Sequence, residues 1–290
     1  MILLTGGSGQ VATELARRAP GRVRRVGRPE FDFDQPASVA RAFAAAAPSL
    51  VVNAAALTAV DAAETDAAGA LRANRDGPAQ LAALCASGGV PFIHISTDYV
   101  FDGSKGAPYV ETDPTSPMGV YGRSKLEGEQ AVLATGAQAV ILRTSWVYAS
   151  FGKNFVRTML GAALRTRTLK VVADQQGCPT NAGDLADAIL AVAGRIEAGW
   201  RPEYAGVFNA AGTGATTWHA LAVAAFEAAA RHGRPMPTVQ AIATKDWPTP
   251  ARRPADSRLD CAKLARVFGV RLPEWRPSLD RTVDAIVAAG

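Results

Sequence analysis

A glycine-rich turn near the N-terminus, between an apolar run and a helical pattern, most constrains the fold. Ile2-Leu3-Leu4-Thr5 has the pattern of a short buried strand and stops at Gly6-Gly7-Ser8-Gly9. Residues 10–18 then place Val11 and Leu15 on one helical face. In this context the turn lets backbone approach a pyrophosphate, whose charge a helix N-terminus favours. We therefore expect the first β-α unit of a dinucleotide-binding fold, with cofactor contacts at Gly6, Gly9, Gln10 and Val11.

Four more strand patterns follow, and helical patterns separate them. The strand patterns lie at residues 23–26, 50–53, 91–96 and 140–142, and the helical patterns at 38–47, 67–87 and 121–133. Strands and helices that alternate over short connections indicate a parallel sheet with helices on both faces. The sequence therefore predicts an α/β protein with a Rossmann-type, doubly wound parallel sheet.

The pattern loosens after Phe151, where shorter helices and strands alternate with polar and proline-rich segments. We expect residues 1–150 to form the dinucleotide-binding domain. Residues 151–290 are expected mainly to form a smaller α/β C-terminal substrate-binding lobe. Since no flexible linker separates the two parts, we expect them to interleave, with residues 181–200 packing back on the first domain.

Charge and cysteine content exclude several classes of protein. The net charge of +5 is scattered without a block of like charges, so the sequence predicts no nucleic-acid partner. The three cysteines are far apart and include no CxxC pair. They predict neither a zinc site nor a disulfide framework, and we expect no metal.

An uncharged span at residues 42–60 is long enough to be considered as a membrane helix. Pro48, Ser49 and Asn53 interrupt it, and we interpret it as a helix end, a turn and a buried strand. Met1 leads straight into a strand pattern, without a charged region or a cleavage site. We therefore expect a soluble, cytoplasmic protein with no membrane partner.

Residues after the second and third strand patterns bear on the cofactor. An acidic residue for the adenosine ribose usually follows the second strand, but here Arg28 lies between a glycine and a proline. Its guanidinium suits a 2′-phosphate, which favours NADPH, with NADH possible; a plain surface arginine is the alternative. Asp32 is a candidate contact for the adenine amino group, and Asp34 is interpreted as a helix start. After the third strand, small side chains leave room for a cofactor at Ala54, Ala55 and Ala56.

The fourth strand pattern ends in a hydroxyl, and a tyrosine and a lysine follow it. Tyr121 and Lys125 are four residues apart, so they lie on one helix face. A lysine cation near a phenol favours the phenolate and lowers the pKa of the tyrosine. Thr97 is then expected to polarise a substrate carbonyl, Tyr121 to protonate the alkoxide as hydride arrives, and Lys125 to hold the nicotinamide ribose. A simple strand-end cap is the alternative for Thr97.

Longer motifs extend through the whole chain. They occupy residues 6–10, 52–56, 58–61, 96–103, 121–125, 143–148, 154–156, 174–180 and 253–260. The string Ser-Thr-Asp-Tyr-Val-Phe-Asp-Gly at 96–103 is far more specific than the glycine motif. With these motifs the chain resembles the extended short-chain dehydrogenase/reductases, and within them the dTDP-4-dehydrorhamnose reductase family. It departs from the family pattern at Leu57, often an aromatic residue there, and at Ala12, which replaces the last glycine.

The resemblance implies NAD(P)H-dependent reduction of the C4 ketone of dTDP-4-dehydro-L-rhamnose to dTDP-L-rhamnose. Thr97, Tyr121 and Lys125 fall on the family's catalytic positions. The dTDP-sugar is expected to contact residues of three further segments, at Thr58, Val60, Asp98, Tyr99 and Trp146. Trp146 as core filling and Asp98 as a turn cap are the simpler interpretations.

Three other functions are open to a chain with these motifs. A nucleotide-sugar 4,6-dehydratase needs a carboxylate pair after the threonine, but Asp98 is followed by Tyr99, which argues against dehydration. A reductase of another dTDP-4-keto-6-deoxysugar differs only in pocket shape. A non-catalytic NADP-binding subunit, like the regulatory subunit of methionine adenosyltransferase, also resembles this family. A homodimer is one possible assembly.

Overall fold

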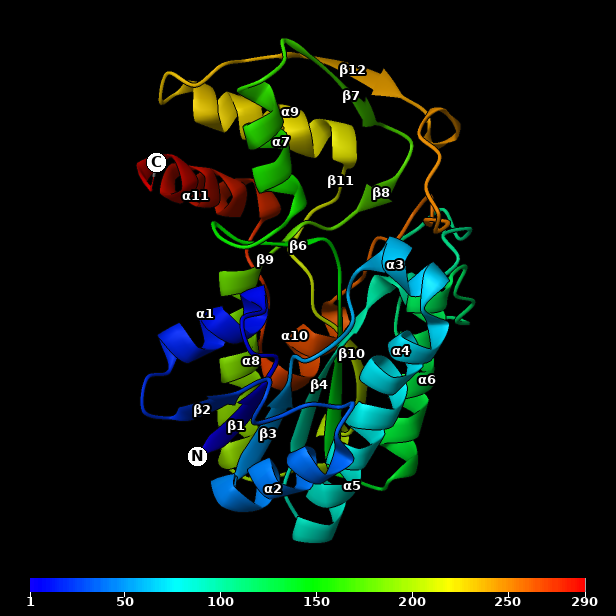
Figure 1. The fold of residues 1–290 in the computed structure, drawn as a ribbon, viewed down its shortest axis with the longest axis vertical. Coiled ribbons are helices and arrows are strands. Elements are labelled where there is room, and N and C mark those ends of the chain that lie inside the picture. Colours follow the sequence, from blue (N-terminus) through cyan, green and yellow to red (C-terminus); the bar gives the residue numbers. More distant parts are fainter. Residues whose placement is uncertain (290) are drawn as a thin grey trace.

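The computed structural model describes residues 1–289, and a six-stranded parallel sheet forms its centre (Figure 1). The strand order is β10-β5-β4-β3-β1-β2. Its strands are β1 (Ile2–Thr5), β2 (Val23–Val26), β3 (Leu50–Asn53), β4 (Phe92–Thr97), β5 (Ala139–Thr144) and β10 (Gly206–Asn209). All five pairings are parallel, with Leu3 opposite Val51 and Val52 opposite Ile93, for example. This confirms the predicted doubly wound α/β fold.

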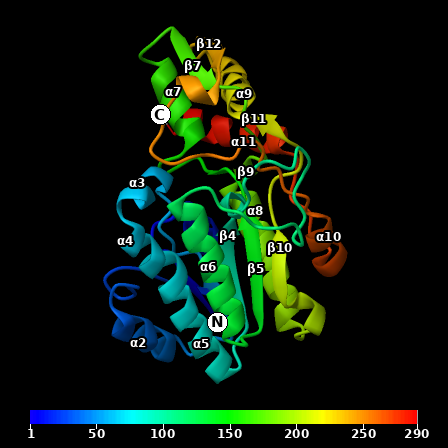
Figure 2. The same ribbon diagram turned by 90° about the vertical axis from the view of Figure 1, so that its right-hand side faces the viewer.

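Helices cover both faces of this sheet. They are α1 (Gln10–Arg18), α2 (Pro36–Ala46), α3 (Val60–Thr65), α4 (Ala67–Leu71), α5 (Gly77–Gly88), α6 (Val120–Ala134), α8 (Ala182–Glu197) and α10 (Ala262–Phe268). Successive residues of a strand point to opposite faces. Leu4 and Ile93 accordingly pack with α1, α8 and α10, whereas Leu3 and Phe92 pack with α2, α5 and α6. Figure 2 shows α6 lying over β4 and β5.

The sequence after residue 150 contributes to this same core. Strand β10 pairs with β5 at the edge of the sheet, and α8 packs against α1. Leu185, Ile189 and Phe208 share one apolar cluster with Leu4 and Ile93. The N-terminal strands therefore depend on the C-terminal half of the chain for part of their burial.

A second group of elements lies beyond the carboxyl ends of the sheet strands, at the top of Figure 1. Its helices are α7 (Phe155–Ala163), α9 (Trp218–Ala230) and α11 (Trp275–Ala288). Short strands pair as β7 (Thr168–Val172) with β12 (Thr238–Ile242), β6 (Val147–Tyr148) with β9 (Thr180–Asn181), and β8 (Gln176–Gly177) with β11 (Thr216–Thr217). The three helices share an apolar cluster that includes Val156, Leu221 and Leu279.

Several elements depart from a regular alternation of strands and helices. The proline-bounded segment Thr238–Ile242 is a strand, because it pairs with β7 along its whole length. Helix α11 begins at Trp275 and tolerates Pro277 in its first turn, where a missing N–H breaks no helical bond. The helical pattern at residues 67–87 is divided into α4 and α5 by a π-helical turn, η1 (Arg72–Asp76). Three 3-10 turns complete the elements of the described residues: η2 (Asp98–Val100), η3 (Pro202–Tyr204) and η4 (Thr244–Asp246).

The span considered as a membrane helix divides between α2, a turn and β3. Among residues 1–289, no helix is long and apolar enough to cross a membrane. In the same part of the chain, no group of three or more His, Cys, Asp or Glu side chains could hold a metal ion.

Candidate active site

A cleft of about 1040 Å³ lies at the carboxyl ends of the parallel strands, where open α/β sheets bind ligands. The predicted site residues that line it are Gly6, Gly9, Gln10, Val11, Arg28, Asp32, Ala54, Ala55, Ala56, Thr58, Thr97, Asp98, Tyr121, Lys125 and Trp146. Val60 and Tyr99 are not among the described lining residues. The structure therefore brings predicted residues from six separate segments to one cavity.

The glycine turn forms one end of the cleft. Gly6 has a φ of 115°, and a Cβ there would lie 2.8 Å from the carbonyl oxygen of Ala54. No side chain of residues 1–289 caps the first turn of α1, whose N-cap is Gly9. Its N–H groups and helix dipole therefore favour an anionic group at this end. The Gln10 side chain accepts a hydrogen bond from Asn154 at 2.9 Å, which ties the turn to the C-terminal half.

Two arginines, Arg28 and Arg72, also line the cleft. Arg28 pairs with Asp32 at 3.0 Å and with Asp34 at 2.7 Å, and its side chain is 70% exposed. Arg72 reaches the other oxygen of Asp34 at 2.9 Å. Asp34 thus bridges two arginines, and Gln35 rather than Asp34 is the N-cap of α2. Sequence spacing did not indicate Arg72, which lies 44 positions beyond Arg28 at the start of η1.

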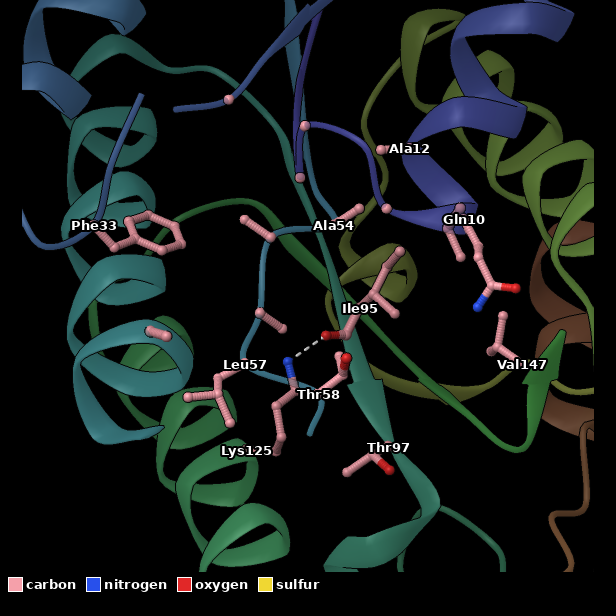
Figure 3. Close-up of a pocket in the computed structure, with 18 of the residues that line it drawn as sticks. Gln10, Ala12, Phe33, Ala54, Leu57, Thr58, Ile95, Thr97, Lys125 and Val147 are labelled. Carbon is pink, nitrogen blue, oxygen red and sulfur yellow. Dashed lines mark hydrogen bonds between the residues drawn. The ribbon is translucent and has the colours of Figure 1, made fainter. Parts of the chain in front are cut away.

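The small residues after β3 form the wall of the cleft beside Lys125 (Figure 3). Asn74 of η1 holds this segment through both backbone groups of Leu57, accepting from its nitrogen at 2.9 Å and donating to its oxygen at 3.0 Å. Asn74 also donates to Ser124 of α6 at 3.0 Å. The buried Asn74 therefore links the cofactor side of the cleft to the helix that carries Tyr121 and Lys125.

Thr97 and Asp98 form a buried polar pair at the end of β4. The Thr97 hydroxyl donates to Asp98 at 3.0 Å and accepts from the backbone nitrogen of Tyr99 at 3.2 Å. Asp98 also accepts from Ser145 at 2.9 Å. Burial raises the pKa of Asp98 to about 6, although hydrogen bonds from Ser257, Ser145 and Thr97 oppose the rise. Thr97 therefore caps the turn at the end of the strand and also lines the cleft.

Tyr121 and Lys125 lie one turn apart on α6, as the spacing predicted, but the pKa of Tyr121 is not lowered as expected. Burial raises the pKa of Tyr121 to about 12, and a hydrogen bond with Thr97 opposes the rise. The Lys125 amine donates to the carbonyl oxygen of Ile95 at 2.6 Å rather than to Tyr121 (Figure 3). Burial lowers the pKa of Lys125 to about 8, against the charge of Glu129. In this arrangement Tyr121 is a protonated phenol at neutral pH.

Trp146, which lines the cleft, is held by a second aromatic residue that the sequence did not connect with it. Trp146 stacks on Trp218 with ring centroids 3.5 Å apart and planes at 9°. Trp146 has a φ of 48°, and a Cβ on Gly177 would lie 2.4 Å from its ring. Trp218 donates to Gln175 at 3.1 Å. Tyr99 lies edge-on to Tyr121, at a centroid distance of 5.8 Å, rather than on the cleft.

Known proteins resemble this chain in sequence over almost its whole length. The model of the RmlD substrate binding domain family matches residues 1–288. The chain belongs to this family. A dTDP-4-dehydrorhamnose reductase of Sinorhizobium fredii is 46% identical over 291 residues, covering 100% of this chain and 98% of the relative. A Streptomyces antibioticus protein named "Probable dTDP-4,6-dihydroxy-2-methyloxan-3-one 4-ketoreductase" is 41% identical, covering 99% and 96%.

Solved structures of the family share the whole fold. A dTDP-4-dehydrorhamnose reductase of Clostridium acetobutylicum is 35% identical, with a TM-score of 0.91 and 99% of both chains covered. A dTDP-4-dehydrorhamnose reductase of Bacillus anthracis in complex with NADP is 28% identical, with a TM-score of 0.88 and 97% of both chains covered. The family membership thus extends over both halves of the chain.

Proposed function

We propose that this chain is an oxidoreductase that uses NADPH, or NADH in its place, to reduce the C4 ketone of dTDP-4-dehydro-L-rhamnose to dTDP-L-rhamnose. The observation that carries the proposal is that Thr97, Tyr121 and Lys125 line the same cleft as the glycine turn. The names of the relatives and the NADP complex of the Bacillus anthracis protein support it.

The cleft residues fit a dinucleotide. Gly6, Gly9, Gln10 and Val11 would face the pyrophosphate, since the uncapped start of α1 attracts an anion. Ala54, Ala55 and Ala56 add little bulk along the strand ends, so they leave room for a flat ligand. Arg28 would hold a 2′-phosphate and Asp32 the adenine, and the second arginine at this edge adds to the preference for NADPH.

Tyr121 would supply the proton. When bound, the reduced nicotinamide supplies the hydride that adds to the ketone carbon. With a pKa near 12, Tyr121 keeps its proton at neutral pH and gives it up only to a stronger base, such as the alkoxide formed from the ketone oxygen. Thr97 would orient that oxygen beside Tyr121, and Lys125 would hold the nicotinamide ribose.

The remaining candidate residues would hold the sugar. Trp146, fixed by Trp218, would give the ring a flat apolar wall. Asp98 and Thr58 also line the cleft and would form hydrogen bonds with the hydroxyl groups of the sugar. Val60 and Tyr99 lie outside the described cleft lining and would contact a ligand that extends beyond the cleft.

A reductase of a related dTDP-4-keto sugar is the second candidate. The Streptomyces antibioticus relative, named as such a ketoreductase, is 41% identical to this chain over almost its full length. A non-catalytic NADP-binding subunit is the third candidate, and the joint presence of Thr97, Tyr121 and Lys125 at one cleft argues against it.

Loss of NADPH absorbance with a panel of dTDP-4-keto-6-deoxysugars tests these candidates. We expect turnover with dTDP-4-dehydro-L-rhamnose and slower turnover with its epimers. Tyr121→Phe should lower kcat by about 10²–10⁴-fold, since it removes the proton donor, and leave NADPH binding intact. Tyr204→Phe, in the core away from the cleft, is the matched control. NADPH binding without turnover of any keto-sugar would favour the binding-subunit alternative.

The roles of the two parts of the chain, its cellular location and its assembly belong to the same proposal. We propose that residues 1–150 act as the cofactor-binding part and residues 151–290 mainly as the substrate-binding lobe, with residues 181–200 returning to the first part. We also propose a cytoplasmic location and a homodimer, which sedimentation equilibrium would distinguish from a monomer.

A further inference from the structure

A buried polar chain runs behind the cleft, from β1 through β3 and β4 to Lys125. The Thr5 hydroxyl donates to the side-chain oxygen of Asn53 at 2.5 Å. The side-chain nitrogen of Asn53 lies 2.9 Å from His94 Nδ1, and His94 Nε2 lies 3.4 Å from Lys125 Nζ. Thr5, Asn53 and His94 are completely buried, and Lys125 is 2% exposed. His94 is not among the described residues that line the cleft, so it can act on a ligand only through Lys125.

The hydrogen bonds at Asn53 decide which nitrogen of His94 carries the proton. The side-chain oxygen of Asn53 accepts from Thr5 and from the backbone nitrogen of Ala55 at 3.2 Å. The amide therefore presents its NH₂ group to His94, and an NH₂ group only donates. His94 Nδ1 must be the acceptor, which leaves the proton on Nε2, facing Lys125. Burial and the charge of Lys125 hold the pKa of His94 well below its usual value, so the ring is neutral.

An N–H directed at the Lys125 amine distinguishes its two protonation states. The neutral amine has a lone pair and accepts a hydrogen bond, whereas the ammonium ion has only donors. The carbonyl oxygen of Ile95, 2.6 Å from Nζ, accepts from either form. We propose that His94 is a positioning residue: with Thr5 and Asn53 behind it, its Nε2–H fixes Lys125 and favours the neutral amine over the ammonium ion.

The other ionisable groups around Lys125 are paired with other side chains or are neutral, so His94 is the group that favours the neutral amine. On α6, Glu129 favours the ammonium ion, but Arg143 of β5 holds it at 2.6 and 2.9 Å. Tyr121, also on α6, is a neutral phenol, and Asp98 of η2 is bonded to hydroxyl groups. On η1, Arg75 is bonded to acidic side chains away from Lys125. If the chain is the reductase proposed above, His94 thereby sets how readily Lys125 releases a proton near neutral pH.

Nuclear magnetic resonance of the wild-type protein gives the first test. Nitrogen-15 spectra of the three histidines should show His94 neutral, with its proton on Nε2, from pH 6 to pH 9. An Nδ1–H tautomer, or protonation of His94 above pH 6, would overturn the proposal. This measurement needs no substitution and no turnover, so its outcome is independent of the proposed reaction.

Two substitutions of His94 give the second test, read from the carbon-13 titration of the labelled Lys125 side chain. Glutamine places an amide nitrogen near the position of Nε2 and keeps the donor, whereas asparagine keeps the acceptor for Asn53 and loses the contact with Lys125. We expect His94→Gln to change the pKa of Lys125 little, and His94→Asn to raise it by about one unit, the worth of roughly one hydrogen bond. Lys125→Met assigns the signal, and His219→Asn, whose ring lies near Val239, is the matched control.

A merely structural role for His94 would give a different result. It would leave the titration of Lys125 unchanged in His94→Asn, and that outcome would refute the proposal. If His94→Asn does not fold, a rise of one unit in His94→Gln would refute it equally. In the proposed reduction, the pH profile of kcat should shift with His94→Asn in the same direction as the Lys125 titration and stay in place with His94→Gln.

Discussion

Asp98 shows how far the environment of a single residue changes its chemistry. In the sequence it is one carboxylate in a motif, but the fold buries it to 2% exposure among hydroxyl groups. Burial raises its pKa from 3.8 to about 6. The protonated carboxyl is therefore favoured in the folded state, and its contribution to stability is complete below about pH 4 and lost as the pH rises through 6.

Asp98→Asn should remove this pH dependence. As the pH rises from 4 to 7, the free energy of unfolding of the variant should increase by about 2–3 kcal/mol relative to that of wild type. The variant lacks the loss of stability that corresponds to about two units of pKa shift. Urea denaturation at several pH values measures it. Glu203→Gln, on an exposed turn, should show no such trend. A constant offset between Asp98→Asn and wild type at every pH would contradict the raised pKa.

Tyr121 and Lys125 illustrate the same point in a pair. Their i, i+4 spacing placed them correctly on one helix face. The expected lowering of the tyrosine pKa does not occur in this structure, because burial and the nearby Asp98 raise it, while the Lys125 amine is bonded to Ile95. Spacing predicts which side chains are neighbours, whereas the direction in which a flexible lysine points depends on the surrounding strands.

At the scale of elements, α6 is positioned by the close approach of its neighbours. A Cβ on Gly128 would lie 1.9 Å from the backbone oxygen of Asn74, and a Cβ on Gly122 would lie 2.1 Å from that of Tyr99. These two glycines let η1 and η2 touch the helix backbone. The register of Tyr121 and Lys125 relative to the cleft thus depends on residues that carry no side chain.

Gly128→Ala and Gly194→Ala form a matched pair on this point. Alanine has the higher helix propensity, so Gly194→Ala, with no described atom within 4 Å of the new Cβ, should stabilise the protein by about 0.5–1 kcal/mol. Gly128→Ala should instead destabilise it by about 1–3 kcal/mol, because the new methyl group overlaps with Asn74. Chemical denaturation measures both. Equal effects at the two positions would show that η1 moves away without cost.

At the scale of the whole molecule, the two halves of the chain share one core. Strand β10 covers the open edge of β5, and α8 covers α1 and the strands beneath it. The side chains of α8 buried in this way are Leu185, Ala186, Ala188, Ile189, Val192, Ala193 and Ile196. A cofactor domain without these elements would expose a sheet edge and an apolar face.

A fragment of residues 1–150 tests this dependence. We expect it to lack a cooperative thermal transition by circular dichroism and to bind a hydrophobic dye, because β5 and α1 lose their partners. The full-length chain should unfold cooperatively under the same conditions. A fragment that unfolds cooperatively and binds NADPH would show that the first 150 residues fold independently.

The sequence by itself determined the order of strands and helices, the parallel sheet and the glycine turn, because these follow from local periodicity and from short connections. It also indicated Thr97, Tyr121 and Lys125, since their spacing along β4 and α6 is set by regular geometry. Only the tertiary structure decided that Arg72 meets Asp34, that Trp218 stacks on Trp146, and that His94 stands behind Lys125. Those contacts join segments distant in sequence, and burial, which sets the ionisation of Asp98, Tyr121 and Lys125, exists only once the chain has folded.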